Sequence, residues 1–245
     1  MLIVAALVIT MLLLSTALYV ADIQKNQLRY SSGSDLYLPF YKQGLRHTMI
    51  IALANISNGG NTGILETNLN QFNSFITDHS YDAFFKSEFT LCNTAPYMNG
   101  IWLAQNSSGT GIVSAFVSFS LNVSGTSETY HSEYEMNVTS MIQTSGHYYL
   151  LNDTERQVNL TCKVFNEGQP ALAKNFTISY EKDGLLDFED WVLVETSNIT
   201  DYGNGTYTIS FNAVTDQPDD PLLIWVSCQD QRNILIQTLV TPTLA

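Results

Sequence analysis

The residues that most often carry out catalysis lie apart from one another in this sequence. No His-Glu-x-x-His zinc motif, Cys-x-x-Cys pair or Gly-x-Ser-x-Gly nucleophile motif occurs. A hydrolase would need a histidine and a carboxylate in one pocket, and the candidates for this are His131 with Glu133 or Glu135. The four histidines are His47, His79, His131 and His147. We therefore expect a protein that is not an enzyme.

Two groups of acidic residues could supply oxygen ligands for Ca²⁺. Neither group has the spacing of an EF-hand loop, so solvated acidic loops are the simpler interpretation. The glycine-rich stretches 59–63 and 203–205 also lack the spacing of a phosphate-binding loop. We expect no metal and no other cofactor. The acidic residues are Asp183, Asp187, Glu189 and Asp190 in the first group and Asp216, Asp219 and Asp220 in the second.

Aromatic side chains could line a carbohydrate site. The chain has 13 tyrosines and three tryptophans, Trp102, Trp191 and Trp225. Trp191 and Trp225 fall in predicted strands, where packing in the core or on a sheet face is the ordinary role. A cluster of Trp102 with tyrosines on a concave surface would indicate a ligand-binding protein.

Two of the three cysteines fall on the apolar side of predicted strands. Cys162 lies in VNLTCKV and Cys228 in LLIWVSC, 66 residues apart. In an extracellular β-sandwich this arrangement predicts a disulfide between the two sheets, and closing a loop of this length would contribute about 4 kcal/mol. The alternative is two buried free thiols, because cysteine packs as a small hydrophobic residue. Cys92 is left without a partner within the chain.

The composition excludes one large class of function. Hydrophobic residues make up 45% of the chain and charged residues 13%, and the formal net charge is −13. The 10 lysines and arginines are spread thinly, so they form no basic patch of the kind that binds nucleic acid or an anionic membrane. We expect no nucleic-acid partner.

The first 21 residues contain no charged side chain. A helix of this length spans roughly 30 Å, the thickness of a bilayer core. A cleaved secretory signal is the alternative, but a basic segment does not precede the apolar run, and the run continues past the small residues at 15–17. We expect residues 1–21 to form a retained helix in contact with a lipid bilayer or with the helices of like subunits.

The sequence is rich in N-glycosylation motifs, Asn-x-Ser/Thr. With 20 asparagines and 46 serines and threonines in 245 residues, chance would give about four such motifs. A composition rich in these residues is the alternative explanation for the excess. The nine predicted acceptors are Asn55, Asn106, Asn122, Asn137, Asn152, Asn159, Asn175, Asn198 and Asn204.

The position of the acceptors along predicted strands supports glycosylation. Asn122, Asn137, Asn159 and Asn175 each alternate with apolar neighbours, so each falls on the polar face of its strand. All four could carry a glycan into solvent. We therefore expect residues 22–245 to lie outside a membrane, in an oxidising compartment that glycosylates proteins.

The first part of the outer region predicts an α+β domain at 22–146. Apolar residues at helical spacing indicate helices at 36–57, with Pro39 in the first turn, and at 63–79. From about residue 82 the period changes to that of strands, which indicates an antiparallel sheet covered on one face by the helices. The predicted strands are 83–92, 99–105, 111–123 and 130–142.

The remainder, residues 147–245, predicts a small β-sandwich, and the stretch 143–156 is the expected boundary. Turn residues such as those at 168–170, 202–205 and 216–221 separate short apolar runs, with no helical stretch between them. The predicted strands are 157–165, 171–181, 191–195, 205–212, 222–228 and 233–240.

Two parts of the chain resemble known families. The start MLIVAALVITMLLL, followed by a helical stem and a β-rich head with glycosylation motifs, resembles archaeal type IV pilin-like proteins with class III signal peptides. That resemblance implies an apolar helix that packs in a filament core, and Ala5 in place of the Glu of many bacterial-type pilins favours a minor component. The stretch YGNGTYTISF at 202–211 resembles the closing strands of immunoglobulin-like modules in prokaryotic surface proteins, which implies a fold rather than an activity.

These observations together predict a single-pass archaeal surface glycoprotein with a structural or adhesive role, in the cell membrane or in a cell-surface filament. The apolar helix would serve as a membrane anchor or as the contact with like subunits in a homo- or hetero-oligomer. The alternative is a membrane-anchored ligand-binding protein, for sugars or for a transporter partner.

Overall fold

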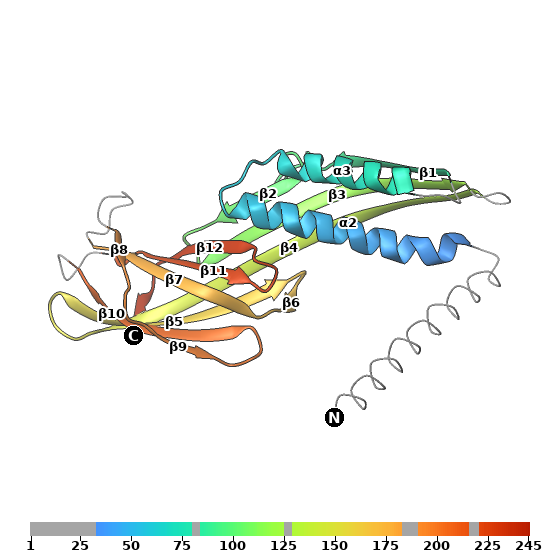
Figure 1. Ribbon diagram of the computed structural model, residues 1–245. Helices are drawn as coiled ribbons and strands as arrows, with labels where there is room; N and C mark the ends of the chain where they lie inside the picture. Colours follow the sequence, from blue (N-terminus) through green and yellow to red (C-terminus); the bar gives the residue numbers. More distant parts are fainter. Residues whose placement is uncertain (1–32, 80–83, 125–128, 183–190, 216–220) are drawn as a thin grey trace, which may run out of the picture.

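The computed structural model describes residues 33–79, 84–124, 129–182, 191–215 and 221–245 (Figure 1). The predicted apolar helix at 1–21 lies outside these ranges. So do the two acidic groups, at 183–190 and 216–220. Within the described ranges, no helix combines the length and the apolarity needed to cross a membrane.

The structure confirms both predicted helices, α2 (Gly33–Ser57) and α3 (Ile64–His79). Because α2 begins three residues earlier than predicted, Pro39 lies in its second turn rather than its first. The helix ends in a Schellman motif, in which Gly60 N donates to Asn55 O and Gly59 N donates to Ile56 O, both at 3.0 Å. Gly59 has a φ of +91°, which glycine adopts without strain and which turns the chain towards α3.

The strands form two sheets that are mainly antiparallel, one of nine strands and one of four. The larger sheet has the order β1-β3-β4-β5-β10-β9, with β2 beside β3, β6 beside β5 and β13 parallel to β4. The smaller sheet has the order β12-β11-β7-β8. This arrangement confirms the α+β class, with helices first and strands after.

The strands occupy the following positions. In the larger sheet they are β1 (Phe84–Leu91), β2 (Ile101–Gln105), β3 (Thr110–Ser124), β4 (Thr129–Leu150), β5 (Glu155–Asn166), β6 (Gln169–Pro170), β9 (Asn198–Asp201), β10 (Thr206–Val214) and β13 (Thr243–Leu244). In the smaller sheet they are β7 (Ala173–Glu181), β8 (Trp191–Leu193), β11 (Ile224–Asp230) and β12 (Leu235–Val240).

Strand β4 crosses the expected boundary between the two parts of the chain. It is 22 residues long, whereas the predicted strand ended at residue 142. Its first part pairs with β3 through residues 129–143, and its last part pairs with β5 through residues 140–150. The position of the expected boundary, between residues 146 and 147, therefore falls inside one strand of a continuous sheet.

One face of the larger sheet is buried, and two different layers cover it. Even-numbered residues of β4 point to this face, from Tyr134, which packs against the core, to the buried Thr144. Figure 1 shows α2 and α3 over the β1–β3–β4 part of the sheet and the smaller sheet over the β4–β5–β10 part. The opposite face is polar, with pairs such as Ser120 beside Glu133.

Aromatic rings fill the space beneath the helices. Phe89, Phe119 and Tyr134 lie in one row across β1, β3 and β4. Phe119 stacks on Tyr134 with 5.4 Å between ring centroids. From α2, Tyr41 is 4% exposed and packs 5.5 Å from the ring of Phe72 on α3. Burying these rings holds the helices on the sheet.

Polar contacts join the end of α2 to the smaller sheet. Ser57 Oγ accepts from Leu235 N at 3.0 Å, and Asn58 Nδ2 donates to Asn233 O at 3.1 Å. Arg46 of α2 also donates to Glu167, which lies in the turn after β5 of the larger sheet, at 2.8 Å. The layer of helices and the smaller sheet are thus in direct contact.

Candidate functional site

No acceptor asparagine of the nine glycosylation motifs is buried. Asn122 and Asn159 are half-buried, and each alternates with buried neighbours on its strand. The other seven residues are exposed: Asn55, Asn106, Asn137, Asn152, Asn175, Asn198 and Asn204. Accessibility is what a glycan requires, and attachment itself stays a prediction.

Several acceptors share the polar face of the larger sheet. Asn159 of β5 lies directly opposite Ser210 of β10, and Ser210 lies opposite Asn198 of β9. Residues that oppose each other across neighbouring strands project on the same face, so Asn159 and Asn198 project on one face about 10 Å apart. Asn122 and Asn137 project on the same face further along β3 and β4.

The amide nitrogens of these asparagines differ in their surroundings, and this nitrogen is the atom that carries an N-linked sugar. In Asn137 it donates to Tyr97 Oη at 3.0 Å, and in Asn152 it donates to Glu155 Oε2 at 3.1 Å. Within the described ranges, Asn106 and Asn204 are held only through the oxygen Oδ1. Their nitrogens are free to take a sugar without breaking a contact.

Asn204 lies in the tight turn between β9 and β10. Tyr202 N donates to Thr206 O at 3.1 Å across the turn, and Asn204 Oδ1 accepts from Thr206 N at 3.0 Å. Gly203 N donates to Asp201 Oδ1 at 2.7 Å. The turn predicted from the sequence YGNGT is confirmed, and these bonds fix the direction of the Asn204 side chain.

The turn packs tightly against β5 and the segment that enters β7. Gly205 O accepts from Val164 N at 2.9 Å, and Val164 O accepts from Ala171 N at 2.9 Å. Gly205 has a φ of +80°, and a Cβ there would lie 2.8 Å from Ala171 O. Only glycine fits, because both the backbone angle and the space exclude a side chain.

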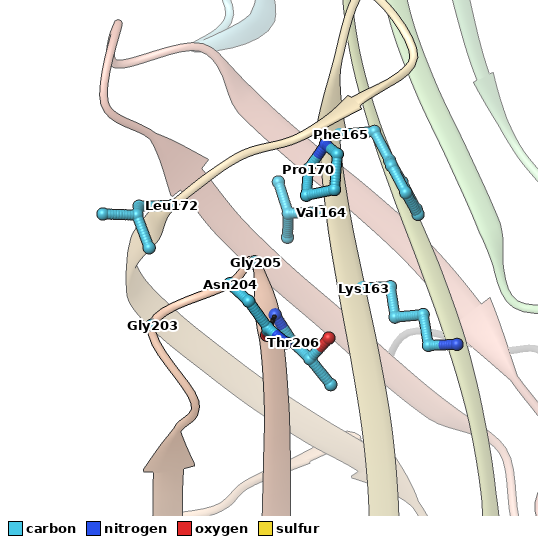
Figure 2. A pocket seen from close by; sticks show the side chains of 9 residues that line it. All are labelled: Lys163, Val164, Phe165, Pro170, Leu172, Gly203, Asn204, Gly205 and Thr206. Atoms are coloured by element: carbon cyan, nitrogen blue, oxygen red, sulfur yellow. Dashed lines mark hydrogen bonds between the residues drawn. The ribbon is translucent and has the colours of Figure 1, made fainter.

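A cavity of about 410 Å³ opens beside this turn (Figure 2). Val164, Pro170 and Leu172 form its apolar side, and Asn204 and Thr206 belong to the turn that borders it. Leu172 is 43% exposed, so its side chain adds accessible apolar surface at the cavity. Lys163 also lines the cavity, and Figure 2 shows its ammonium directed away from the turn.

The cysteines are free thiols, so the predicted disulfide between Cys162 and Cys228 is not formed in the structure. Both residues are fully buried, on strands of different sheets, as the sequence predicted. Strand phase places a cysteine on the inner face, but it does not decide whether two inner Cβ atoms come within the roughly 4 Å that a disulfide needs. Cys92 is half-buried and also free.

Burial controls the acidity of the two inner thiols. It raises the pKa of Cys162 to about 11, and the hydrogen bond from Thr144 Oγ1, at 3.5 Å, offsets this only in part. Burial also raises the pKa of Cys228, and the neighbouring Cys162 and Asp230 act in the same direction. At neutral pH both residues are protonated and chemically unreactive.

The remaining sequence candidates are not brought together in a pocket. His131 Nε2 lies 3.5 Å from Glu133 Oε1, but the two side chains are 54% and 76% exposed on the polar face of the sheet. His131 Nδ1 also contacts Asn122 Oδ1 at 2.7 Å. Within the described part of the chain, no group of three or more histidine, cysteine or acidic residues could hold a metal ion.

The tryptophans lie in two separate aromatic clusters. Trp102 packs edge-on against Tyr97 with 5.9 Å between centroids, and Tyr97 also packs against Phe116. Trp191 and Trp225 pack edge-on against each other at 6.1 Å, from β8 and β11. Neither cluster lines the cavity beside Asn204.

Comparison with known proteins finds no family model that matches this chain and no curated protein that is significantly similar to it. The arguments for function therefore rest on the residues and their geometry.

Sequence reasoning identified Asn204 and the turn but missed the apolar side of the cavity. Val164 was predicted as a strand residue, and Pro170 was predicted in a turn. No signal in the sequence links these residues to a turn more than 30 positions away. Strand β9 was also not predicted from the sequence. Together with β10 it forms the hairpin that carries the turn.

Proposed function

We propose that this chain is a non-enzymatic archaeal surface glycoprotein with a structural or adhesive role. Residues 22–245 lie outside the membrane, and residues 1–21 are held in the bilayer or packed against helices of like subunits, as in a minor pilin-like component. The observation that carries the proposal is the accessibility of all nine acceptor asparagines, spread over both sheets and α2, with none in the core.

The long sheet supports a structural role. Strand β4 alone has 22 residues and so extends over roughly 70 Å. It pairs with β3 beneath the helices and with β5 beneath the smaller sheet, so both layers share one hydrogen-bonded strand. A continuous sheet of this kind transmits force along the molecule without a flexible linker.

We also infer that the C-terminal part is an immunoglobulin-like sandwich. The smaller sheet contacts the β5–β10 part of the larger sheet through side chains. Tyr207 Oη of β10 accepts from Ala173 N of β7 at 2.7 Å, and the ring of Tyr207 lies 4.7 Å from that of Phe176. Tyr180 of β7 stacks on Phe211 of β10 at 6.3 Å. Two sheets in such contact are typical of domains that present loops for adhesion.

The test is electron microscopy of the native cell envelope, combined with mass spectrometry of this chain. The proposal expects glycans on several of the nine acceptors and extraction only with detergent or within ordered filaments. Filaments would support the pilin-like form, and dispersed particles in detergent would support the membrane anchor. A chain without glycans that is released by washing in buffer would contradict the proposal.

The ligand-binding alternative has one observation in its favour. Trp102, on β2, packs against Tyr97, which lies in the loop before that strand. Tyr97 Oη is also bonded to Ser114 and Asn137, so the ring is held in place at the edge of the polar face. Tryptophan fluorescence during titration with neutral oligosaccharides tests this function. Quenching that disappears in Trp102→Leu but persists in Trp225→Leu would support it.

A further inference from the structure

We propose that the cavity beside the β9–β10 turn holds the first sugar rings of a glycan on Asn204 of the same chain. The rings pack against Pro170 and Leu172 and hold the hairpin against the segment that enters β7. The inference rests on the proposed function, because it requires a compartment that glycosylates the protein. It goes further by assigning an occupant and a stabilising role to one cavity.

The point of attachment lies in the lining of the cavity itself. Asn204 borders the cavity, and its oxygen Oδ1 is occupied by Thr206 N at 3.0 Å. The nitrogen Nδ2 is thus the open position of a side chain that is already fixed. A sugar bonded to it begins at the cavity, so its high effective concentration compensates for an affinity that would be too weak for a free sugar.

The chemistry of the cavity suits a pyranose ring. One face of such a ring presents C–H groups, and its edges present hydroxyls. Pro170 and Leu172 offer exposed apolar surface to the face, and the Thr206 hydroxyl can bond an edge. The volume of about 410 Å³ lies within the roughly 300–1,000 Å³ of small-ligand sites.

The neighbouring acceptor Asn198 provides the comparison. It lies on β9 of the same hairpin, projects on the polar face beside Ser210, and does not line the cavity. A glycan on Asn198 would extend into solvent. The proposal therefore predicts that two glycans on one hairpin differ in what they contribute to stability.

The experiment removes each glycan without touching its asparagine, since Asn204 Oδ1 is needed in the turn. Thr206→Val abolishes the motif of Asn204, and Thr206→Ser retains it. Thr200→Val abolishes the motif of Asn198. The full chain is purified in detergent from the native envelope, mass spectrometry records occupancy, and thermal unfolding is followed by circular dichroism.

We expect Thr206→Val to lower the unfolding midpoint by about 2–4 °C relative to Thr206→Ser, and Thr200→Val to leave it unchanged. Leu172→Ser, which removes the apolar wall, should lower the midpoint when Asn204 carries its glycan and have a smaller effect in the Thr206→Val background.

Four results would overturn the inference. An occupied Asn204 with equal effects of Leu172→Ser in both backgrounds would show that the glycan does not contact the cavity. Equal shifts in Thr206→Val and Thr200→Val would show the same. An unmodified Asn204 beside modified acceptors elsewhere would refute the inference and leave the proposed function standing. A chain with no glycan at any acceptor would refute both.

Discussion

The guanidinium of Arg232 neutralises the fully buried carboxylate of Asp230, with Nε 2.8 Å from Oδ2. Ser140 Oγ of β4 donates to the same oxygen at 2.7 Å, and Arg232 Nη1 reaches Glu167 Oε1 at 2.7 Å. These contacts join the turn after β11 to the middle of β4 and to the turn after β5. A buried charge of this kind is tolerated only while its partners are in place.

Replacement of Arg232 by alanine is expected to destabilise the protein by about 3–5 kcal/mol, because Asp230 would remain buried without a counter-ion. Urea unfolding at pH 7 measures the free energy. Arg46→Ala is the matched control: it removes another partner of Glu167, but the Arg46 side chain is 45% exposed, so the loss should not exceed about 1 kcal/mol. Equal losses in the two variants would contradict this account of the Asp230 charge.

Alkaline pH is expected to weaken the packing of α2 on the sheet. Burial raises the pKa of Tyr41 to about 12 from an ordinary value of 10.0, and its hydrogen bond to Ser87 offsets this only in part. The unfolded chain loses the tyrosine proton first, so the stability that Tyr41 contributes is present below pH 10 and decreases as the pH rises towards 12.

The measurement is the free energy of unfolding at several pH values between 9 and 12. Tyr41 should contribute a slope of at most about 1.4 kcal/mol per pH unit. In Tyr41→Phe this part of the slope should disappear. A control, Tyr202→Phe, alters an exposed tyrosine and should retain the slope. An unchanged slope in Tyr41→Phe would contradict the prediction.

The thiols are expected to differ in reactivity. At pH 8 iodoacetamide should modify Cys92 in the folded protein and leave Cys162 and Cys228 unmodified, because burial keeps the inner thiols protonated. Peptide mass spectrometry identifies the labelled residues. Unfolding without a reductant then tests the predicted disulfide: free thiols become labelled, whereas a disulfide in the native protein would block both. Rapid labelling of Cys162 before unfolding would contradict its burial.

The two glycines beside Asn204 are expected to respond differently to alanine. Gly203 has a φ of +72° and open space around it, so Gly203→Ala should cost about 1–2 kcal/mol from backbone strain alone. Gly205→Ala should cost more, because its Cβ would also collide with the backbone of Ala171. Urea unfolding of both variants measures the two losses of unfolding free energy and checks that Gly205→Ala loses more. Asn204→Ala, a third variant in the same turn, is measured beside them for comparison. A smaller loss in Gly205→Ala would contradict the tight contact.

Local patterns accounted for much of the secondary structure. The change from helical to strand period near residue 82 correctly placed two helices before the strands, and turn residues separated most of the strands. The errors occur where pairing rather than sequence decides. Residues 143–150 continue β4 because β5 supplies hydrogen bonds to them, and the exposed strand β9 exists because β10 lies beside it. A polar stretch such as Asn198–Asp201 has no apolar alternation to reveal a strand.

The sequence by itself determined the positions of the two helices, the turn around Asn204 and the accessible phase of acceptors such as Asn122 and Asn159. Each depends on residues within a few positions of one another. Only the tertiary structure decided that one long sheet connects both parts, that the ion pair of Arg232 and Asp230 is buried, and that Leu172 and Asn204 line the same cavity. These relationships join residues distant in the chain, and they arise from strand pairing and from the packing of the two layers on one sheet face.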